Sequence, residues 1–294
     1  MVTPADAIDR INAVFGRHPG HRALHAKGRF YAGTFTPSAE AAELCRAGHL
    51  QAAVPVWVRW SNGSGHPRTP DRAPDVRGMA VSFRLPDGTA TDLLGQTSPR
   101  FPVRTAEEFL DLVEHAKPHL LPRFLIRHRQ ATGPLLANAR ARAVVPPYSF
   151  AEATYYPIHA YRWLAPDGTS RWVRYVMEPL AAKADRPAAK ADGRNRLFDE
   201  IEARLAERPV RFRLAVTIAT EKDDPHDPMS VWRGERALDA GVIEVTAPDP
   251  DRETDGEVVV FDPTRVVDGI ELSDDPILRY RASAYSESVA RRLE

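Results

Sequence analysis

Cysteine is nearly absent from this 294-residue sequence, in which Cys45 is the single example. One thiol cannot form an internal disulfide, and it cannot supply the several thiolates of a structural zinc or iron–sulfur site. The first residues also lack the basic and then apolar pattern of a secretory signal, because Asp6 and Asp9 interrupt any apolar stretch. We therefore expect a protein of the reducing cytoplasm, with Cys45 packed in its core.

Long apolar runs and an excess of charge are also missing. No stretch approaches the roughly 18 apolar residues that a membrane-spanning helix requires. The 40 Lys and Arg residues balance the 40 Asp and Glu residues, so no overall basic field attracts nucleic acid or an anionic membrane. Hydrophobic residues still make up 43% of the chain, which suffices for a core. We expect a soluble globular protein that binds neither nucleic acid nor membranes.

The residue pattern predicts one domain over residues 1–294, built mainly from short strands. Several segments alternate apolar and polar residues, and Pro-Asp-Gly turns at 86–88 and 166–168 join neighbouring strands into hairpins. The predicted strands lie at 29–35, 54–60, 79–85, 161–164, 172–177, 211–220, 241–246 and 258–261, with one more ending near Leu94.

Fewer segments predict helices. Thr3 followed by Pro4 is typical of an N-cap and first helical position, and Thr105 with Glu108 forms a capping box. The predicted helices run from Pro4 to just before Gly16, over 106–116, around 197–205, and from 276 almost to the last residue. Hairpin-linked strands with peripheral helices predict an α+β fold built on an antiparallel barrel.

The last of these helices carries an unusual combination of side chains. Offsets of four and eleven residues place Arg281, Tyr285 and Arg292 on one helical face. One interpretation is a solvated helix surface. The other is an arginine that holds a tyrosine as a phenolate, and tyrosinate is one of the protein ligands used for haem iron.

The residues around this helix make the sequence similar to the catalase family. Residues 275–285 resemble the family's haem-ligand segment, with Arg281 and Tyr285 in register. Other matching segments follow in the family's order, at 22–28, 58–61, 75–83, 92–95, 99–101, 226–228, 261–264 and 269–271. The resemblance implies a catalase-like antiparallel β-barrel with peripheral helices. We expect it to lack the N-terminal arm and C-terminal extension of full-length catalases, as in small catalase-related haem peroxidases.

The resemblance also implies haem b as the cofactor and assigns roles to individual residues. Tyr285 would be the metal ligand, kept deprotonated by Arg281, and His159 with Asp275 would support that arginine. His25 would act as acid–base catalyst, with Ser61 hydrogen-bonded to its other ring nitrogen. The remaining cofactor contacts would be Phe109 beside the haem face and three arginines on the haem propionates, Arg22, Arg59 and Arg292.

One position departs from the family pattern. Gln96 follows Gly95 where the family carries its distal asparagine, and glutamine is one methylene longer. We therefore expect weak catalase activity and a peroxidase that reduces hydrogen peroxide or organic hydroperoxides with an organic electron donor. Without an exchanged arm, a monomer or homodimer is expected.

Three other interpretations compete with this one. A haem carrier or sensor without turnover would not need a distal histidine braced by serine. A lipid-hydroperoxide-converting enzyme of the allene oxide synthase type is disfavoured by Leu24, which stands where those enzymes carry threonine. A zinc site formed by His18, His21 and His25 is disfavoured because Pro19 and Gly20 interrupt any helix between them.

Overall fold

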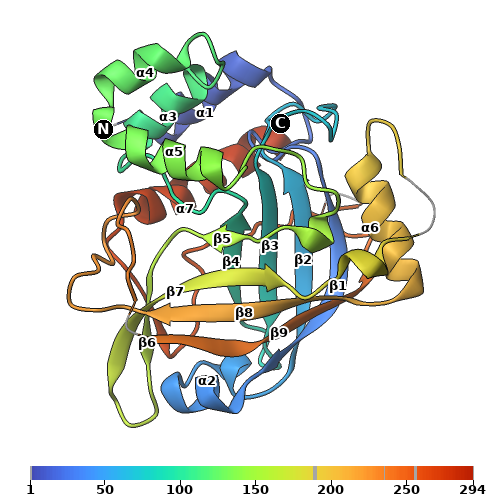
Figure 1. The fold of residues 1–294 in the computed structure, drawn as a ribbon, viewed down its shortest axis with the longest axis vertical. Helices are drawn as coiled ribbons and strands as arrows, with labels where there is room; N and C mark the ends of the chain where they lie inside the picture. Colours follow the sequence, from blue (N-terminus) through green and yellow to red (C-terminus); the bar gives the residue numbers. More distant parts are fainter. Residues whose placement is uncertain (1, 188–190, 235, 255–256, 294) are drawn as a thin grey trace.

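A computed structural model describes residues 2–187, 191–234, 236–254 and 257–293. Its centre is a ten-stranded antiparallel sheet that curls into a barrel (Figure 1). Tyr155, which precedes the edge strand at 156–157, forms an isolated antiparallel bridge with Met177 in the strand at 170–179. This bridge brings one edge of the sheet back to an earlier strand. In spatial order the strands are β10 (Ile270–Leu272), β6 (Tyr161–Leu164), β7 (Ser170–Pro179), β8 (Val210–Ile218), β9 (Arg236–Pro248), β1 (Gly28–Pro37), β2 (Val54–Asn62), β3 (Arg77–Arg84), β4 (Ala90–Gln96) and β5 (Tyr156–Pro157).

Aromatic side chains fill the interior of this barrel. The ring of Trp60 stacks on Phe150 with centroids 6.0 Å apart, and Tyr31 meets Trp60 edge-on at 4.8 Å. Strand β8 shows why the sheet forms, because its alternating pattern buries Phe212 and Leu214 while arginines point outward. The predicted barrel is thus confirmed. Cys45 is buried as expected, with Sγ donating to the carbonyl of Gly269 at 3.2 Å.

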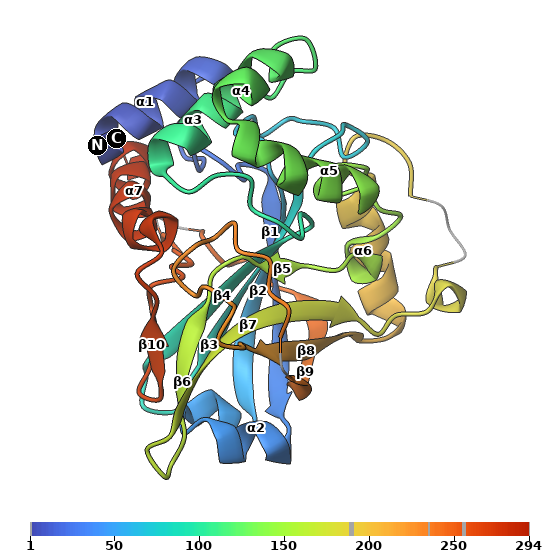
Figure 2. The ribbon, with the colours of Figure 1, turned by 60° about the vertical axis from the view of Figure 1, so that its left-hand side comes forward.

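Most helices gather at one end of the sheet (Figures 1 and 2). This group contains α1 (Pro4–Phe15), α3 (Ala106–Glu114), α4 (Leu121–Arg127), α5 (Thr132–Arg140) and α7 (Pro276–Leu293), whereas α2 (Ala39–Leu44) lies at the opposite end and α6 (Arg196–Glu207) lies beside the sheet. The side chains of Thr3 and Thr105 cap α1 and α3 as predicted. Among the described residues, no helix is both long enough and apolar enough to cross a membrane.

The C-terminal helix α7 is tied to the N-terminal helix α1. Arg291 forms ion pairs with Asp9 on α1 and with Glu287 on its own helix, and the hydroxyl of Tyr280 donates to the carbonyl of Thr3 at 3.0 Å. These contacts hold the first and last helices of the chain together. The helix that carries Tyr285 is therefore held by contacts at both of its ends, since Asp275 caps its first turn.

The predicted strand at 258–261 is wrong. This segment is extended but not paired with a strand, because side chains rather than a neighbouring backbone satisfy its polar groups. The amide of Val259 donates to Glu253, and the carbonyl of Val259 accepts from Arg22. The pattern also failed to predict α2, α4, α5 and the short strands β5 and β10. Of these, α5 is as long as α3 but buries only Pro134 and Asn138, so it has no apolar face, and the others are too short for a clear period.

Candidate functional site

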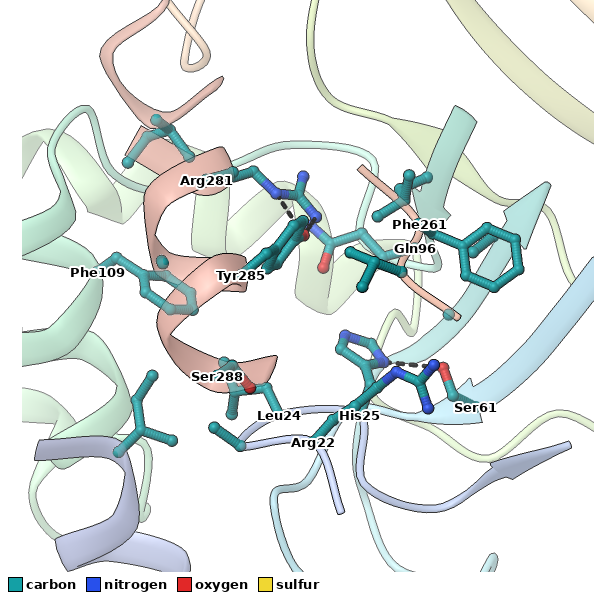
Figure 3. A pocket seen from close by; sticks show the side chains of 18 of the residues that line it. Arg22, Leu24, His25, Ser61, Gln96, Phe109, Phe261, Arg281, Tyr285 and Ser288 are labelled. Atoms are coloured by element: carbon teal, nitrogen blue, oxygen red, sulfur yellow. Dashed lines mark hydrogen bonds between the residues drawn. The ribbon is translucent and has the colours of Figure 1, made fainter. Parts of the chain in front are cut away.

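A cavity of about 280 Å³ lies between the helical end of the molecule and the sheet (Figure 3). Helices α1, α3 and α7 form one side of it, and the ends of β2, β3 and β4 form the other. All of the predicted site residues except His159 and Asp275 line this cavity. Its size is close to the lower limit for pockets that hold small molecules and cofactors.

One wall of the cavity carries Tyr285, which projects from α7. Arg281 lies one turn earlier, and its Nε donates a hydrogen bond to the tyrosine Oη at 2.7 Å, with a second donation from Nη2. A guanidinium can only donate, so the phenolic oxygen accepts from two cationic N–H groups. This arrangement favours an oxygen that carries negative charge.

Behind Arg281 a buried histidine and carboxylate complete a chain of hydrogen bonds. Nη1 of Arg281 lies 3.0 Å from Nε2 of His159, and Nδ1 of His159 lies 2.6 Å from Oδ2 of Asp275. Both His159 and Asp275 are almost fully buried. Burial lowers the pKa of His159, although Asp275 opposes that effect, so the ring is neutral. His159 therefore lies outside the cavity and contacts it only through Arg281.

The opposite wall carries His25 (Figure 3). Its Nδ1 lies 2.9 Å from Oγ of Ser61. Its backbone has a φ of 54°, which is uncommon for a residue other than glycine. Two hydrogen bonds hold this conformation, from the His25 amide to the carbonyl of Gly63 and from Arg59 to the His25 carbonyl, both 3.0 Å long. Burial, and next the charge of Arg59, lower the pKa of His25 to about 3.

The register of the sheet places the partners of His25 in one row. Ser61 on β2 pairs with Gly78 on β3, and Gly78 pairs with Gln96 on β4. A Cβ on Gly78 would lie 2.7 Å from Ser61 Oγ and 2.9 Å from the His25 ring, so only glycine leaves room for this contact. Gln96 lines the same cavity, and Figure 3 shows its side chain reaching into the cavity.

Apolar side chains line much of the remaining surface. Phe109 on α3 stacks against Phe101 with ring centroids 5.9 Å apart, and Leu24 lies next to His25. Ile8 and Ile11 of α1 also line the cavity. The cavity thus combines polar groups on two facing walls with an apolar surround, which suits a mostly apolar ligand that carries a few polar groups.

Three arginines converge at one end of the cavity: Arg22, Arg59 and Arg292. Within the part of the chain that the structure describes, their acidic partner is Glu253, which pairs with Arg22 at 2.7 Å and with Arg292 at 3.3 Å. Among the described residues, Nε of Arg59 and Nη2 of Arg292 are buried and have no hydrogen-bond partner. Burial, and next the charge of Arg22, lower the pKa of both of these arginines.

The charge and the unsatisfied donors of this site can be compared with what haem requires. Counted over the described residues, three guanidinium groups and one carboxylate leave a net charge near two positive units, and a tetrapyrrole with two carboxylates would balance it. The apolar walls suit the macrocycle, and the tyrosine and histidine lie where groups on its two faces would lie. The residues present therefore fit haem.

Glu253 was not predicted from the sequence. It lies in a polar loop between β9 and β10 in which several carboxylates alternate with arginines, and no pattern there distinguishes one acidic residue from another. Only the fold brings it to Arg22, which is 231 residues away. The histidine set His18, His21 and His25 does not form a metal-ligand cluster within the part of the chain that the structure describes.

Two relatives match almost the whole chain. A catalase-related peroxidase of Mycolicibacterium paratuberculosis is 45% identical over 99% of this chain and 95% of its own length. A catalase-related peroxidase of Synechococcus elongatus is 28% identical over 99% of this chain and 89% of its own length. Because these relatives are named as peroxidases, the comparison lends no support to the carrier or the isomerase interpretation.

Structure and family comparisons give the same answer. A bacterial catalase superposes with a TM-score of 0.77 at 20% identity, covering 98% of this chain and 59% of the catalase, which shows a shared fold. The family model described as Catalase matches residues 7–294. This chain therefore belongs to the catalase family.

Proposed function

We propose that this protein is a haem-dependent peroxidase that reduces hydrogen peroxide or an organic hydroperoxide with electrons from an organic donor. The observation that carries the proposal is that a histidine and a tyrosine face each other across one cavity, each held by a hydrogen bond to a neighbouring side chain. His25, braced by Ser61 at 2.9 Å, faces Tyr285, which Arg281 holds at 2.7 Å. Relatives named catalase-related peroxidases support the same reaction class.

The cofactor in this proposal is haem b, with Oη of Tyr285 as the iron ligand. When bound, haem supplies the redox-active iron on which peroxide is reduced. Arg22, Arg59 and Arg292 would hold the two propionates, because Arg59 and Arg292 each have a buried donor without an acceptor among the described residues and Arg22 lies beside them. Phe109 would pack against one face of the macrocycle from α3.

On the tyrosine side, the role of the protein is to keep negative charge on Oη. Arg281 donates twice to that oxygen and is itself oriented by His159 and Asp275. Each partner fixes the next, so the guanidinium cannot rotate away from the phenol without breaking a buried hydrogen bond.

On the histidine side, the role of the protein is to move a proton. With its Nδ1–H donated to Ser61 Oγ, His25 presents the lone pair of Nε2 to the cavity. Nε2 then accepts the proton from one oxygen of the peroxide. It returns this proton to the other oxygen, which leaves as water or an alcohol when the O–O bond breaks. Burial and the charge of Arg59 lower the pKa of His25 to about 3, so the ring is unprotonated and the lone pair of Nε2 is free at neutral pH.

Gln96 favours the use of an organic donor over dismutation of peroxide. Its side chain is one methylene longer than the asparagine of the family pattern, so its amide reaches past the position from which it would bind a second peroxide molecule. We include in the proposal that the chain acts as a single domain, as a monomer or homodimer, and in the cytoplasm.

The test is an absorption spectrum of the haem-reconstituted protein, followed after peroxide is added with and without an aromatic donor. We expect a tyrosinate-type ferric spectrum and peroxide consumption that depends on the donor. Vigorous oxygen release without a donor would show a small catalase instead. A haem spectrum that does not respond to peroxide would reject the enzyme and favour the carrier.

A further inference from the structure

Glu253 occupies the centre of the arginine cluster, and no role has so far been assigned to it. Its Oε2 accepts from Nη1 of Arg22 at 2.8 Å and its Oε1 accepts from Nη2 at 2.7 Å, a bidentate pair. Oε1 also lies 3.3 Å from Nη1 of Arg292. The carboxylate is therefore placed where an anionic group of a ligand would bind.

These contacts occupy both terminal nitrogens of Arg22. Nη2 of Arg22 donates additionally to the carbonyl of Val259 at 2.8 Å, so both terminal nitrogens already have acceptors. Arg59 and Arg292, in contrast, each keep a buried nitrogen without a partner. A bidentate contact from a cofactor carboxylate to Arg22 thus requires Glu253 to share or release its hydrogen bonds.

The backbone of Glu253 has an unusual conformation that its own side chain stabilises. Its φ is 65°, in the left-handed region that residues with a Cβ rarely adopt. The side chain braces this turn, because Oε1 also accepts from the amide of Val259 at 3.1 Å. A strained residue that persists because its side chain is ion-paired is typical of a functional position.

We propose that Glu253 is an internal counter-ion that competes with the carboxylates of the cofactor for Arg22 and Arg292, and so limits the affinity for haem. The inference rests on the proposed function. Without the cofactor, Glu253 stabilises three clustered guanidinium groups that would otherwise repel one another. With the cofactor, the same carboxylate adds a negative charge beside the incoming propionates, which weakens their binding.

The test compares haem binding by the full-length apoprotein with and without this charge. The Glu253→Gln variant keeps the shape of the side chain and removes the charge. We expect the Kd for haem, from a titration followed at the Soret band, to fall about three- to fivefold, the size typical of one partly exposed ion pair. The melting temperature of the apoprotein should fall, because the arginines lose their counter-ion.

Two controls isolate the effect. The dimethyl ester of haem has no free carboxylate, so its Kd should be the same for both proteins. The Glu271→Gln variant loses an exposed ion pair with Arg162 on strands β10 and β6 and should match the wild type with both ligands. Should Glu253→Gln fail to fold, Glu253→Asp provides the second test. Aspartate tolerates the left-handed backbone but cannot reach both partners, and it should lower the Kd by a smaller factor.

The outcomes separate this inference from the proposed function. Three results for Glu253→Gln would overturn competition at Arg22. They are weaker haem binding, an unchanged Kd for haem, and an equal change in Kd for haem and its dimethyl ester. Failure of the wild-type protein to bind haem at all would instead reject the proposed function.

Discussion

Arg281 donates from Nη1 to Nε2 of His159 across 3.0 Å, and this contact determines where the single ring proton of His159 lies. Because a guanidinium has no lone pair to offer, Nε2 must be the acceptor. The proton is therefore on Nδ1, which donates to Asp275 at 2.6 Å. The position of Arg281, and through it that of Tyr285, depends on this one tautomer.

The Asp275→Asn variant tests that dependence. Asp275 uses Oδ2 for His159 and Oδ1 for the amide of Ile277, and asparagine has only one side-chain oxygen for these two donors. We expect the free energy of unfolding in urea to fall by about 2 kcal/mol, as for a lost buried bond to a charged group, and the haem spectrum to shift. Asp274→Asn, at an exposed neighbour paired with Arg279, is the control. An unchanged stability would contradict the tautomer argument.

The Tyr285→Phe variant tests the proposed iron ligand. Phenylalanine keeps the ring but removes the oxygen that accepts from Arg281. We expect the tyrosinate-type spectrum to disappear and haem retention on a desalting column to drop. Tyr280→Phe removes a hydroxyl from the same helix, one that donates to the carbonyl of Thr3, and it should keep the spectrum at a cost of about 1 kcal/mol in stability. Full retention of the spectrum by Tyr285→Phe would exclude this residue as the ligand.

Stability should decrease in mild acid because buried histidines resist protonation. The folded pKa values of His25 and His49 are lowered by burial to about 3, whereas an unfolded histidine titrates near 6.5. The unfolded chain thus takes up protons first, and stability is lost as pH falls from about 6.5 toward 3. Each histidine contributes a slope of about 1.4 kcal/mol per pH unit.

The His49→Leu variant isolates one of these slopes. His49 packs near Phe83 with ring centroids 4.8 Å apart, and its Nδ1 has no hydrogen-bond partner, so leucine removes a titrating group at little structural cost. Urea unfolding at several pH values should show a slope lower by about 1.4 kcal/mol per pH unit between pH 3.5 and 6. His119→Leu, at an exposed position, is the control. Identical slopes for His49→Leu and the wild type would refute a neutral buried His49.

The Gly78→Ala variant tests the packing of His25 on Ser61. The added methyl would meet both side chains at less than their normal separation, so one of them must move. We expect a loss of about 1–3 kcal/mol in stability and slower peroxide reduction. Gly133→Ala on α5 meets nothing within 4 Å and should preserve both quantities. Normal activity in Gly78→Ala would show that the contact is dispensable.

The Gln96→Asn variant tests the balance between peroxidase and catalase reactions. The shorter amide restores the residue of the family pattern, and we expect oxygen release without a donor to rise about tenfold, equivalent to 1.4 kcal/mol in the barrier. An oxygen electrode measures it directly, with Gln96→Leu as a control that lacks the amide. A rate no higher than that of Gln96→Leu would mean that the length of this side chain does not limit dismutation.

Local sequence was enough to predict much of the framework. The capping threonines Thr3 and Thr105, the Pro-Asp-Gly turns and the alternating strands use contacts within a few residues, and these were confirmed. The spacing of Arg281 and Tyr285 likewise predicts their contact, because residues four apart on a helix are neighbours. The extended segment at 258–261 shows the limit, since a strand pattern does not reveal whether a partner strand is present.

Tertiary structure alone decided the contacts between distant segments. The bond between His25 and Ser61 spans 36 residues, that between Arg281 and His159 spans 122, and that between Arg22 and Glu253 spans 231. Sheet register and the path of each loop set such distances, and neither is encoded in the spacing of residues along the chain. The sequence by itself determined which chemical groups are available and which helix carries the tyrosine. The fold decided which carboxylate pairs with the arginines and which ring nitrogen of His159 carries the proton.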